Sequence, residues 1–232
     1  MDIKTRLQLL KIQLVGQRAE IRARRMQTFL NLVKPPAGAK IIDLGGTPFL
    51  WSLLDGLNFD VTLVNLPSEE RAADVPPEFR MIYADACELQ QLFPDKYFDV
   101  VFSNSVIEHV GDRDRQHAFA QEVLRLADAY WVQTPCPSFP IEAHTGTPFY
   151  WQRSERARQR LIENWEKTLP AWSEMVRGTR AISQQELQEL LPHSSLYIER
   201  FMGLPKSCTV YRPFQTQEST LGQRSQASQL VS

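Results

Sequence analysis

The stretch "IIDLGGTPFLWSLL", residues 41–54, decides the fold class of this 232-residue chain. An apolar strand pattern runs into the glycine pair Gly45 and Gly46, and a helical pattern starts directly afterwards. Thr47 can cap that helix and Pro48 suits its first position, so the unpaired amides of the helix would face the glycines. The turn is therefore expected to accept a carboxylate or a phosphate, although a plain strand-to-helix connection has the same pattern.

Short apolar runs alternate with helical patterns from residue 40 onward. Continuous apolar runs bounded by turns are typical of strands buried on both faces, which belong to parallel sheets covered by helices. This alternation predicts an open α/β fold. A chain of this length with 43% apolar residues suits one domain with additions. The predicted strands lie within residues 39–45, 59–67, 79–86, 97–105 and 129–135.

Further segments surround these strands. Residues 1–34 predict an amphipathic helix that packs its apolar stripe on the domain or on a second copy as a homodimer, unless it is a basic arm for a charged partner. Residues 149–181 have a helical pattern and are expected to form a lid after the fifth strand. The main domain spans residues 35–212 and ends in two strands joined by a tight Gly-Leu-Pro connection. Residues 213–232 are polar and are expected to be disordered. The apolar stripe is Ile3, Leu7, Leu10, Leu14 and Ile21.

Charge and cysteine content exclude several classes of protein. A net charge of −1 gives no overall attraction to nucleic acid or to an anionic membrane, so neither is expected as a partner. The charged first residues lack the apolar core of a signal peptide, which favours a cytoplasmic protein. Cys87, Cys136 and Cys208 lie far apart without metal-ligand spacing, so neither a disulfide nor a structural zinc is expected.

Polar residues recur where the predicted strands end. Asn65 follows the second strand, 22 positions beyond Asp43, where a nucleoside site places a side chain on the ribose hydroxyls. Asp85 follows the third strand, where a carboxylate could accept a hydrogen bond from an adenine amino group. The segment "SNSVIEHV" follows the fourth. Because the carboxyl ends of parallel strands meet at one edge of a sheet, these residues outline a nucleoside-shaped pocket.

The motifs "IIDLGG", "VTLVNLP", "YADACEL", "FDVVFSNSVIEHV" and "QTPCPSFPIEAH" follow one another in an order that resembles a known family. They are similar to class I S-adenosylmethionine-dependent methyltransferases of the small-molecule, methyltransferase type 11-like kind, over roughly residues 38–150. The resemblance implies a Rossmann-like, doubly wound sheet of seven strands in the order 3-2-1-4-5-7-6, with strand 7 antiparallel. It also implies S-adenosyl-L-methionine as the cofactor.

The resemblance also implies which residues hold the cofactor. The methionine part would lie against Asp43, Gly45, Gly46 and Thr47, the ribose against Asn65 and Leu66, the adenine against Asp85, Ala86 and Cys87, and the sulfonium end against Asn104 and Ser105. Two positions depart from the family pattern: Thr47 replaces a second glycine, and Asn65 replaces an acidic ribose partner. Asn65 lacks the charge-assisted strength of a carboxylate, so we expect modest affinity for the cofactor.

The residues after the fourth strand indicate the class of methyl acceptor, because a tetrapeptide typical of amine methylation is absent there. Enzymes that methylate amines of DNA bases or glutamine usually carry an "NPPY"-type tetrapeptide there, whereas here Asn104 is followed by Ser105, Val106 and Ile107. An oxygen of a small molecule, such as a saccharide or secondary metabolite, is therefore the expected acceptor. Transfer from a sulfonium needs alignment and removal of the hydroxyl proton, and no metal.

Histidine is the expected base, since its pKa lies near working pH. His144 lies just past the fifth strand with Glu142 two residues away, which could orient it or act itself; a structural histidine that hydrogen-bonds the loop is the alternative. His109 could also be catalytic, or could shape the cofactor pocket. His117 and His193 are expected at the surface.

Other interpretations remain open at this stage. Aromatic residues of the lid could stack on an acceptor or form its core: Tyr150, Trp151, Trp165 and Trp172. A non-catalytic interaction module would fit the altered glycine loop and Asn65. A nicotinamide-dependent oxidoreductase would share the crevice, but the Gly-x-Gly-x-x-Gly spacing is absent.

Overall fold

A computed structural model describes residues 19–54, 56, 58–67 and 75–215. The stripe residues Ile3, Leu7, Leu10 and Leu14 and the tail from residue 216 lie outside the described residues, so the predictions made for them stay predictions. Within the described part of the chain, no helix is both long and apolar enough to cross a membrane.

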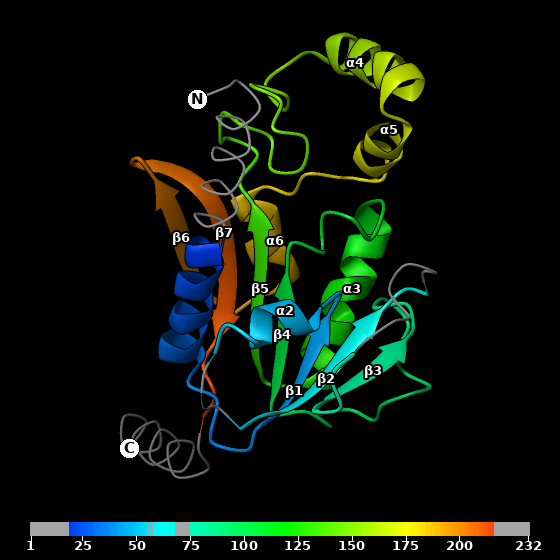
Figure 1. Cartoon of the computed structure of the whole chain (residues 1–232). Helices are drawn as coiled ribbons and strands as arrows, with labels where there is room; N and C mark the ends of the chain where they lie inside the picture. The colour runs from blue at the N-terminus through cyan, green and yellow to red at the C-terminus, as the bar shows by residue number, and fades with distance from the viewer. Residues whose placement is uncertain (1–18, 55, 57, 68–74, 216–232) are drawn as a thin grey trace, which may run out of the picture.

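The core of the fold is one seven-stranded sheet in the order β3-β2-β1-β4-β5-β7-β6 (Figure 1). The first five strands pair in parallel, and β7 runs antiparallel to both β5 and β6. This confirms the predicted strand order and the antiparallel strand 7. The strands are β1 (Lys40–Leu44), β2 (Asp60–Asn65), β3 (Phe79–Tyr83), β4 (Val100–Asn104), β5 (Ala129–Pro135), β6 (Ser195–Phe201) and β7 (Leu204–Arg212).

Helices cover both faces of the sheet, which explains why its central strands are almost wholly apolar. On one face α3 (Arg113–Leu126) and α6 (Gln184–Leu190) bury Phe119 and Leu187 against β1, β4 and β5. On the other face the helix at residues 19–33 and the short α2 (Pro48–Trp51) pack against the same strands. Two apolar cores therefore enclose the sheet.

The helix at residues 19–33 packs on the domain through its C-terminal half. Met26, Phe29 and Val33 are fully buried, and the Phe29 ring meets Phe102 edge to face at 5.0 Å between centroids. Burial of each such side chain contributes roughly 2 kcal/mol. For these residues the structure agrees with packing on the domain, one of the alternatives left open by the sequence.

Arg25 extends from this helix across the carboxyl ends of the strands. It forms a two-pronged ion pair with Glu199 of β6 at 2.9 and 3.0 Å, and donates to Asn104 of β4 at 2.8 Å and Gln133 of β5 at 3.1 Å. Because the guanidinium presents several donors in one plane, one side chain can fix three strand ends relative to the helix.

The insertion after β5 contains α4 (Glu155–Thr168) and α5 (Pro170–Arg177), which lie beyond the carboxyl end of β5 (Figure 1). Its aromatic residues divide between two roles. Tyr150 and Trp165 are buried and stack on each other at 6.0 Å, so they form the insertion's own core. Trp151 instead lines a cavity, and Trp172 is partly exposed.

The predicted turn of the C-terminal hairpin is wrong. The turn of the hairpin is Met202–Gly203, both with positive φ, whereas Leu204 and Pro205 already belong to β7. A two-residue turn with positive φ matches the right-handed twist of the strands, which is why it is preferred here.

The expectation of no disulfide is also wrong, because Cys136 and Cys208 form one. They are 72 positions apart in sequence, but antiparallel pairing of β5 with β7 brings their Cα atoms to 5.8 Å. This separation lies within the range for a disulfide. The spacing of the cysteines in the sequence did not indicate this contact, because strand pairing creates it. Cys87 remains a buried free thiol.

Candidate functional site

The glycine turn after β1 wraps closely around Asp43. Gly45 has φ +78°, and a Cβ there would overlap the side chain of Val106, while a Cβ at Gly46 would overlap the Asp43 carboxylate. Both positions therefore require glycine for lack of space. Thr47 occupies the N-cap position of α2, but its side chain makes no capping hydrogen bond.

The carboxyl group of Asp43 is buried beside this turn. Trp51 Nε1 donates to Oδ2 at 2.8 Å, whereas Oδ1 has no hydrogen-bond partner among the residues described. Burial raises the pKa of Asp43 to about 7, opposed in part by the Trp51 hydrogen bond. A buried acceptor without a donor is costly and fits a site that receives a donor from a ligand.

A cavity of about 400 Å³ follows the carboxyl ends of β1, β2, β3 and β4. A smaller cavity of about 180 Å³ adjoins the glycine turn. Cys87 is buried and lines neither, although its backbone N–H donates to Asp85 at 2.9 Å. The larger cavity is lined by the predicted residues Gly45, Asn65, Leu66, Asp85, Ala86 and Ser105, and the smaller by Asp43, Gly45, Gly46, Thr47 and Asn104.

Two contacts fix the polar side chains of the larger cavity. Asn65 Nδ2 donates to the Gly46 carbonyl at 2.8 Å, which connects the end of β2 to the glycine turn. Asp85 forms an ion pair with Arg115 of α3. Although burial works in the opposite direction, hydrogen bonds from Cys87 N–H and Arg115 lower the pKa of Asp85, so it stays ionised. Arg115 was missed by the sequence analysis because it is one of several charged residues at the start of α3.

A third cavity, of about 300 Å³, lies on the other side of Ser105. Arg22 and Arg25 of the first helix line it, together with five residues of the loop after β5: Phe139, Ile141, Glu142, Ala143 and Gly146. Ser105, with φ +57°, follows β4 and donates its hydroxyl to Gln133 at 3.0 Å. Because Ser105 lines both this cavity and the 400 Å³ cavity, the two meet at that residue.

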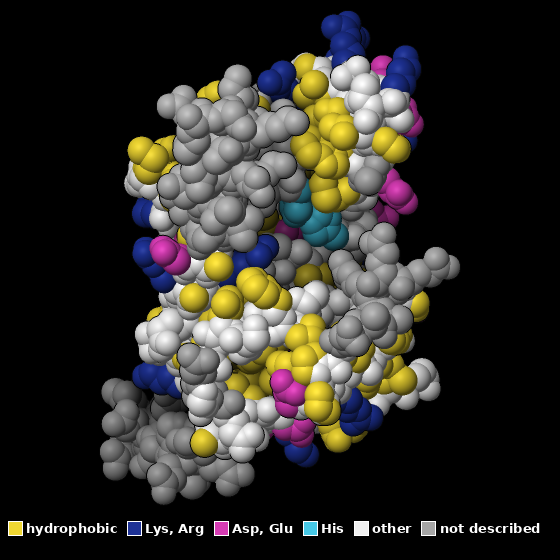
Figure 2. Space-filling view, viewed as in Figure 1, with side chains coloured by type: hydrophobic (Ala, Val, Ile, Leu, Met, Phe, Trp, Pro, Cys, Tyr) yellow, Lys and Arg dark blue, Asp and Glu magenta, His cyan; other side chains and the backbone are white. Residues whose placement is uncertain are grey.

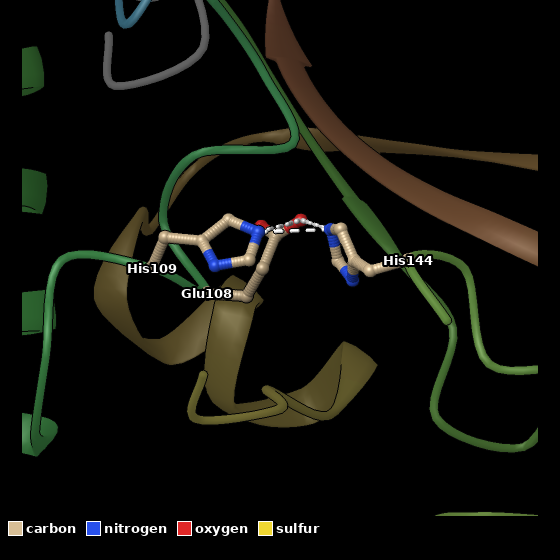
Figure 3. A group of neighbouring side chains, drawn as sticks. All are labelled: Glu108, His109 and His144. Atoms are coloured by element: carbon tan, nitrogen blue, oxygen red, sulfur yellow. Dashed lines mark hydrogen bonds and ion pairs between the residues drawn. The ribbon is translucent and has the colours of Figure 1, made fainter. Parts of the chain in front are cut away.

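Three side chains converge near this junction: Glu108, His109 and His144 (Figure 3). The Nε2 atoms of His109 and His144 lie 2.8 Å apart, and Glu108 Oε1 lies 4.0 Å from each of them. Glu108 is 2% exposed, whereas the histidine side chains keep 29% and 19% of their surface open. Figure 2 shows histidine side chains at the surface of a hollow below the apolar face of the insertion.

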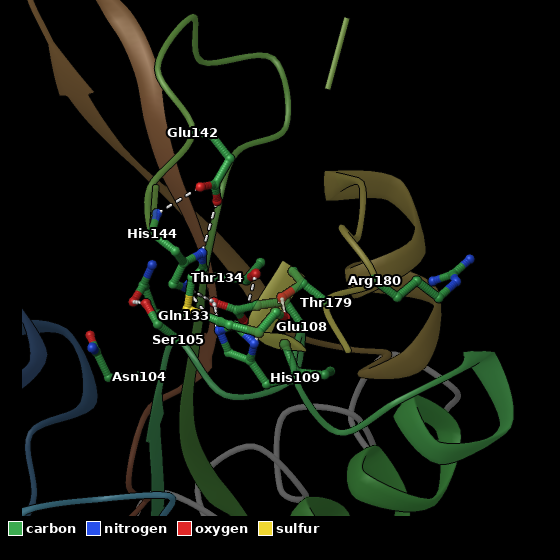
Figure 4. Close-up of polar contacts among 12 residues, drawn as sticks. Asn104, Ser105, Glu108, His109, Gln133, Thr134, Glu142, His144, Thr179 and Arg180 are labelled. Carbon is green, nitrogen blue, oxygen red and sulfur yellow. Dashed lines mark hydrogen bonds and ion pairs between the residues drawn. The ribbon is translucent and has the colours of Figure 1, made fainter. Parts of the chain in front are cut away.

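Every member of this cluster is held from behind by a hydrogen bond (Figure 4). Glu142 Oε1 lies 2.8 Å from His144 Nδ1, and Thr179 Oγ1 lies 3.0 Å from His109 Nδ1. Thr134 of β5 donates to Glu108 Oε2 at 3.0 Å. The cluster thus assembles residues from the loop after β4, from β5, from the loop after it and from the end of the insertion.

The charges in the cluster are set by burial and by these contacts. Burial raises the pKa of Glu108 to about 7, and burial together with the charge of His144 lowers the pKa of His109 to about 4. For His144, burial acts against the charged form, but the Glu142 carboxylate outweighs it and raises the pKa. Glu142 is buried too, yet hydrogen bonds from His144 and Thr145 lower its pKa to about 2.

Part of this arrangement was predicted from the sequence. The structure brings together His109, His144 and Glu142, the three residues expected to be catalytic, while His117 and His193 are exposed as expected. Glu108 and Thr179 were not predicted from the sequence. A carboxylate within the apolar run "SVIEHV" was the available sign for Glu108, since such a residue is buried only for a reason.

Comparison with known proteins supports a family assignment. Residues 46–128 match the family model described as "Methyltransferase domain". Two uncharacterized proteins of Mycobacterium tuberculosis, from strains CDC 1551 and H37Rv, are each 27% identical over 148 residues. This match covers 60% of the chain and 50% of each of those proteins, so the chain spans half the length of these relatives.

Two solved structures share the fold at low sequence identity. A SAM-dependent methyltransferase of Archaeoglobus fulgidus is 12% identical with a TM-score of 0.52, and the match covers 84% of this chain and 94% of that one. A protein of Nostoc punctiforme described as an O-methyltransferase is 12% identical with a TM-score of 0.53, covering 84% of this chain and 56% of that one. The match to the methyltransferase-domain model, the strand order and the strand-end cavities together make this chain similar to class I, S-adenosylmethionine-dependent methyltransferases.

Proposed function

We propose that this protein transfers a methyl group from S-adenosylmethionine to a hydroxyl oxygen of a small molecule such as a saccharide or secondary metabolite. The meeting of the two cavities at Ser105, beside the cluster of Glu108, His109 and His144, carries this proposal. A methyl group that moves from the cofactor in one cavity to the acceptor in the other has to cross that junction. In-line transfer requires that the two cavities share such a boundary.

The side chains that line the first two cavities fit the proposed cofactor. Asp43 Oδ1, buried and without a donor among the described side chains, suits an ammonium group. Asn65 suits ribose hydroxyls, and the ionised Asp85 suits the donor edge of adenine. When bound, S-adenosylmethionine supplies an electrophilic methyl group on a sulfonium.

The cluster at the junction is proposed to assist loss of the acceptor's proton. His144 is the residue that we assign to this task, with His109 at hydrogen-bond distance from it. Glu142 is a positioning residue, because its oxygens already accept hydrogen bonds from His144 and Thr145 and its low pKa makes it a weak base. The helical insertion is proposed to act as a lid over the 300 Å³ cavity, to which it contributes Trp151.

The cofactor step is tested by calorimetry of the purified chain with S-adenosylhomocysteine, the demethylated product. We expect micromolar affinity, and the absence of heat with both this product and S-adenosylmethionine would refute the proposal. Transfer of a labelled methyl group is then measured on matched panels of hydroxyl and amine acceptors. Transfer only to amines would replace the oxygen acceptor, and binding without any transfer would favour the interaction module.

Glu142→Gln tests the positioning role. The substitution removes the charge that orients His144 and favours its protonated form, so we expect methyl transfer to slow by about 10- to 100-fold, the range of such supporting residues. Affinity for S-adenosylhomocysteine should not change, since Glu142 lines only the acceptor-side cavity. Glu163→Gln, at an exposed position of α4, is the matched control. Equal rates for the two variants would exclude a role for Glu142 in the reaction.

A further inference from the structure

In the cluster of Glu108, His109 and His144, the hydrogen bonds among the side chains leave acceptor atoms without a donor. Thr179 Oγ1 gives its single proton to the Met175 carbonyl at 2.8 Å, so it can only accept from His109, and His109 Nδ1 must carry the proton between them. The Nε2 atom of His109 then carries no proton and presents a lone pair. His144 Nδ1 likewise donates to the Glu142 carboxylate, which directs a second imidazole Nε2 toward the first.

Two lone pairs at 2.8 Å repel unless a positive centre lies between or beside them. A proton on His144 Nε2 would satisfy the nitrogen pair, but it would leave Glu108 Oε1 alone. That oxygen is buried, has no hydrogen-bond partner in the described part of the chain, and lies 4.0 Å from both nitrogens. A cation that binds all three atoms would satisfy every one of them at once.

We propose that Glu108 Oε1, His109 Nε2 and His144 Nε2 bind a divalent transition-metal cation, of which Zn²⁺ is the representative. Two nitrogens each about 2.1 Å from one cation lie about 3.0 Å apart at right angles and about 3.4 Å apart in a tetrahedron. The 2.8 Å separation is close to the first value, and a tetrahedral Zn²⁺ requires the two nitrogens to move apart by about 0.6 Å. The carboxylate oxygen has to approach by about 1 Å to complete such a geometry.

The hydrogen bonds behind the three ligands support a metal site. Each ligand is oriented by a second group: Glu142 for His144, Thr179 for His109 and Thr134 for Glu108. Metal-binding histidines almost always donate their other ring N–H to a carboxylate or another oxygen in this way. Two imidazoles and one carboxylate favour Zn²⁺ and its neighbours over Mg²⁺ and Ca²⁺, which prefer oxygen ligands alone.

Such a site deepens the proposed function and rests on it for its role. Three protein ligands leave a coordination position open, and a cation lowers the pKa of a hydroxyl bound there. The acceptor's proton would pass to solvent, and His144 would assist that loss through the cation that it binds. The acceptor class would then be molecules whose hydroxyl can reach a metal from the 300 Å³ cavity, including vicinal diols that bind through two oxygens.

The binding of Zn²⁺ is tested without any assay of activity. The full chain is stripped with a chelator and titrated with Zn²⁺ or Mg²⁺, and metal content is measured after dialysis. Substitution of Co²⁺ reports the ligands through its visible absorption. We expect one Zn²⁺ and no Mg²⁺ per chain. Glu108→Gln, His109→Asn and His144→Asn should each weaken Zn²⁺ binding by about 100-fold or more, at least as much as loss of a supporting residue.

His117→Asn and His193→Asn are the matched controls, since both histidines are exposed and lie outside the cluster. Their Zn²⁺ affinity should equal that of the parent. Absence of Zn²⁺ binding by the parent, or equal binding by cluster and control variants, would overturn the proposal. Thermal unfolding identifies any variant that fails to fold, and the Co²⁺ spectrum of the parent decides between nitrogen and all-oxygen ligands without any substitution.

Calorimetry with S-adenosylhomocysteine on the same samples separates the two proposals. Zn²⁺ binding by a chain that does not bind this product would refute the proposed methyl transfer and leave the metal site standing. Methyl transfer at full rate by the metal-free chain would leave the proposed function standing and overturn the catalytic role of the cation.

Discussion

At the scale of the residue, Asp43 carries an uncompensated carboxylate oxygen that the proposed function assigns to a ligand. The glycine turn encloses its carboxyl group so closely that one oxygen has no donor among the described residues. The native state therefore favours the neutral form of the acid, as its pKa of about 7 shows. A structure selected only for stability would place an amide or an apolar side chain there.

The raised pKa of Asp43 makes stability depend on pH with a definite sign. Because the native pKa of about 7 lies above the ordinary value of 3.8, the unfolded chain gives up this proton first. The stability from this group is complete below pH 3.8 and is lost as the pH rises to about 7. Asp43→Asn does not titrate, so its free energy of unfolding should exceed that of the parent by up to about 4 kcal/mol at pH 7. The difference should shrink toward pH 4.

Urea unfolding of parent and Asp43→Asn across that pH range measures the difference. A difference that stays constant with pH would show that folding does not raise the pKa of Asp43. The same variant should bind S-adenosylhomocysteine about tenfold or more weakly, since it loses the proposed charged acceptor for an ammonium group. If the role of Asp43 is binding, we expect Asp43→Asn to raise the free energy of unfolding and to weaken affinity for the ligand.

At the scale of the element, the junction of β1 and β4 depends on the absence of a side chain at Gly45. Gly45 and Gly38 share nearly the same backbone, with φ of +78° and +74°, but only Gly45 faces a neighbour that a Cβ would overlap. Gly45→Ala should therefore cost more than Gly38→Ala by about 1–3 kcal/mol, the usual cost of overpacking. The strain of positive φ is common to both variants and cancels in the comparison.

Chemical unfolding of both glycine variants gives the two costs. Val106→Ala introduced into Gly45→Ala should recover part of the loss, because it removes the atoms that the new Cβ overlaps. Equal costs for Gly45→Ala and Gly38→Ala would mean that the turn moves away from Val106 without penalty.

The elements themselves could be predicted from local pattern, and the reason is physical. Apolar runs such as Val100–Phe102 and Tyr130–Val132 have to be buried on both faces, and this requirement is set by consecutive residues of the sequence. The order of the strands came from resemblance to a family. The hairpin turn was misplaced because Gly203 supports several turn types, and the choice depends on how β6 and β7 align.

At the scale of the whole molecule, the disulfide connects the segment before the insertion to strand β7, which comes after it. Cys136 follows β5 and Cys208 lies in β7, so the bond closes a loop that contains α4, α5, α6 and β6. Closing a loop of this length in the unfolded chain stabilises the native state by about 4 kcal/mol in the chain-entropy account.

Counting thiols tests this bond directly. In denaturant without a reductant we expect one reactive thiol, from Cys87, and after reduction three. Reduction should also lower the free energy of unfolding by about 4 kcal/mol. Three thiols under both conditions in freshly purified protein would show that the pair stays reduced, and Cys136→Ser would then leave stability nearly unchanged.

The site could be predicted only where a single segment contains it. The loop with Glu142 and His144, and the strand-end residues Asp43 and Asn65, each lie in one short motif. Glu108, Arg115 and Thr179 take their importance from partners on other elements, such as Thr134 for Glu108 and Asp85 for Arg115. Contacts of that kind arise when elements pack, and no local pattern in the chain reports them.

The ion pair between Arg25 and Glu199 has a consequence for how the molecule is made. Its two residues are 174 positions apart, so the arginine is synthesised early and its partner close to the last strand. On a ribosome, the first half of the sheet can form while Arg25 still lacks that partner. The 300 Å³ cavity, which Arg25 and Lys206 of β7 line together, is therefore complete only after the hairpin has been translated.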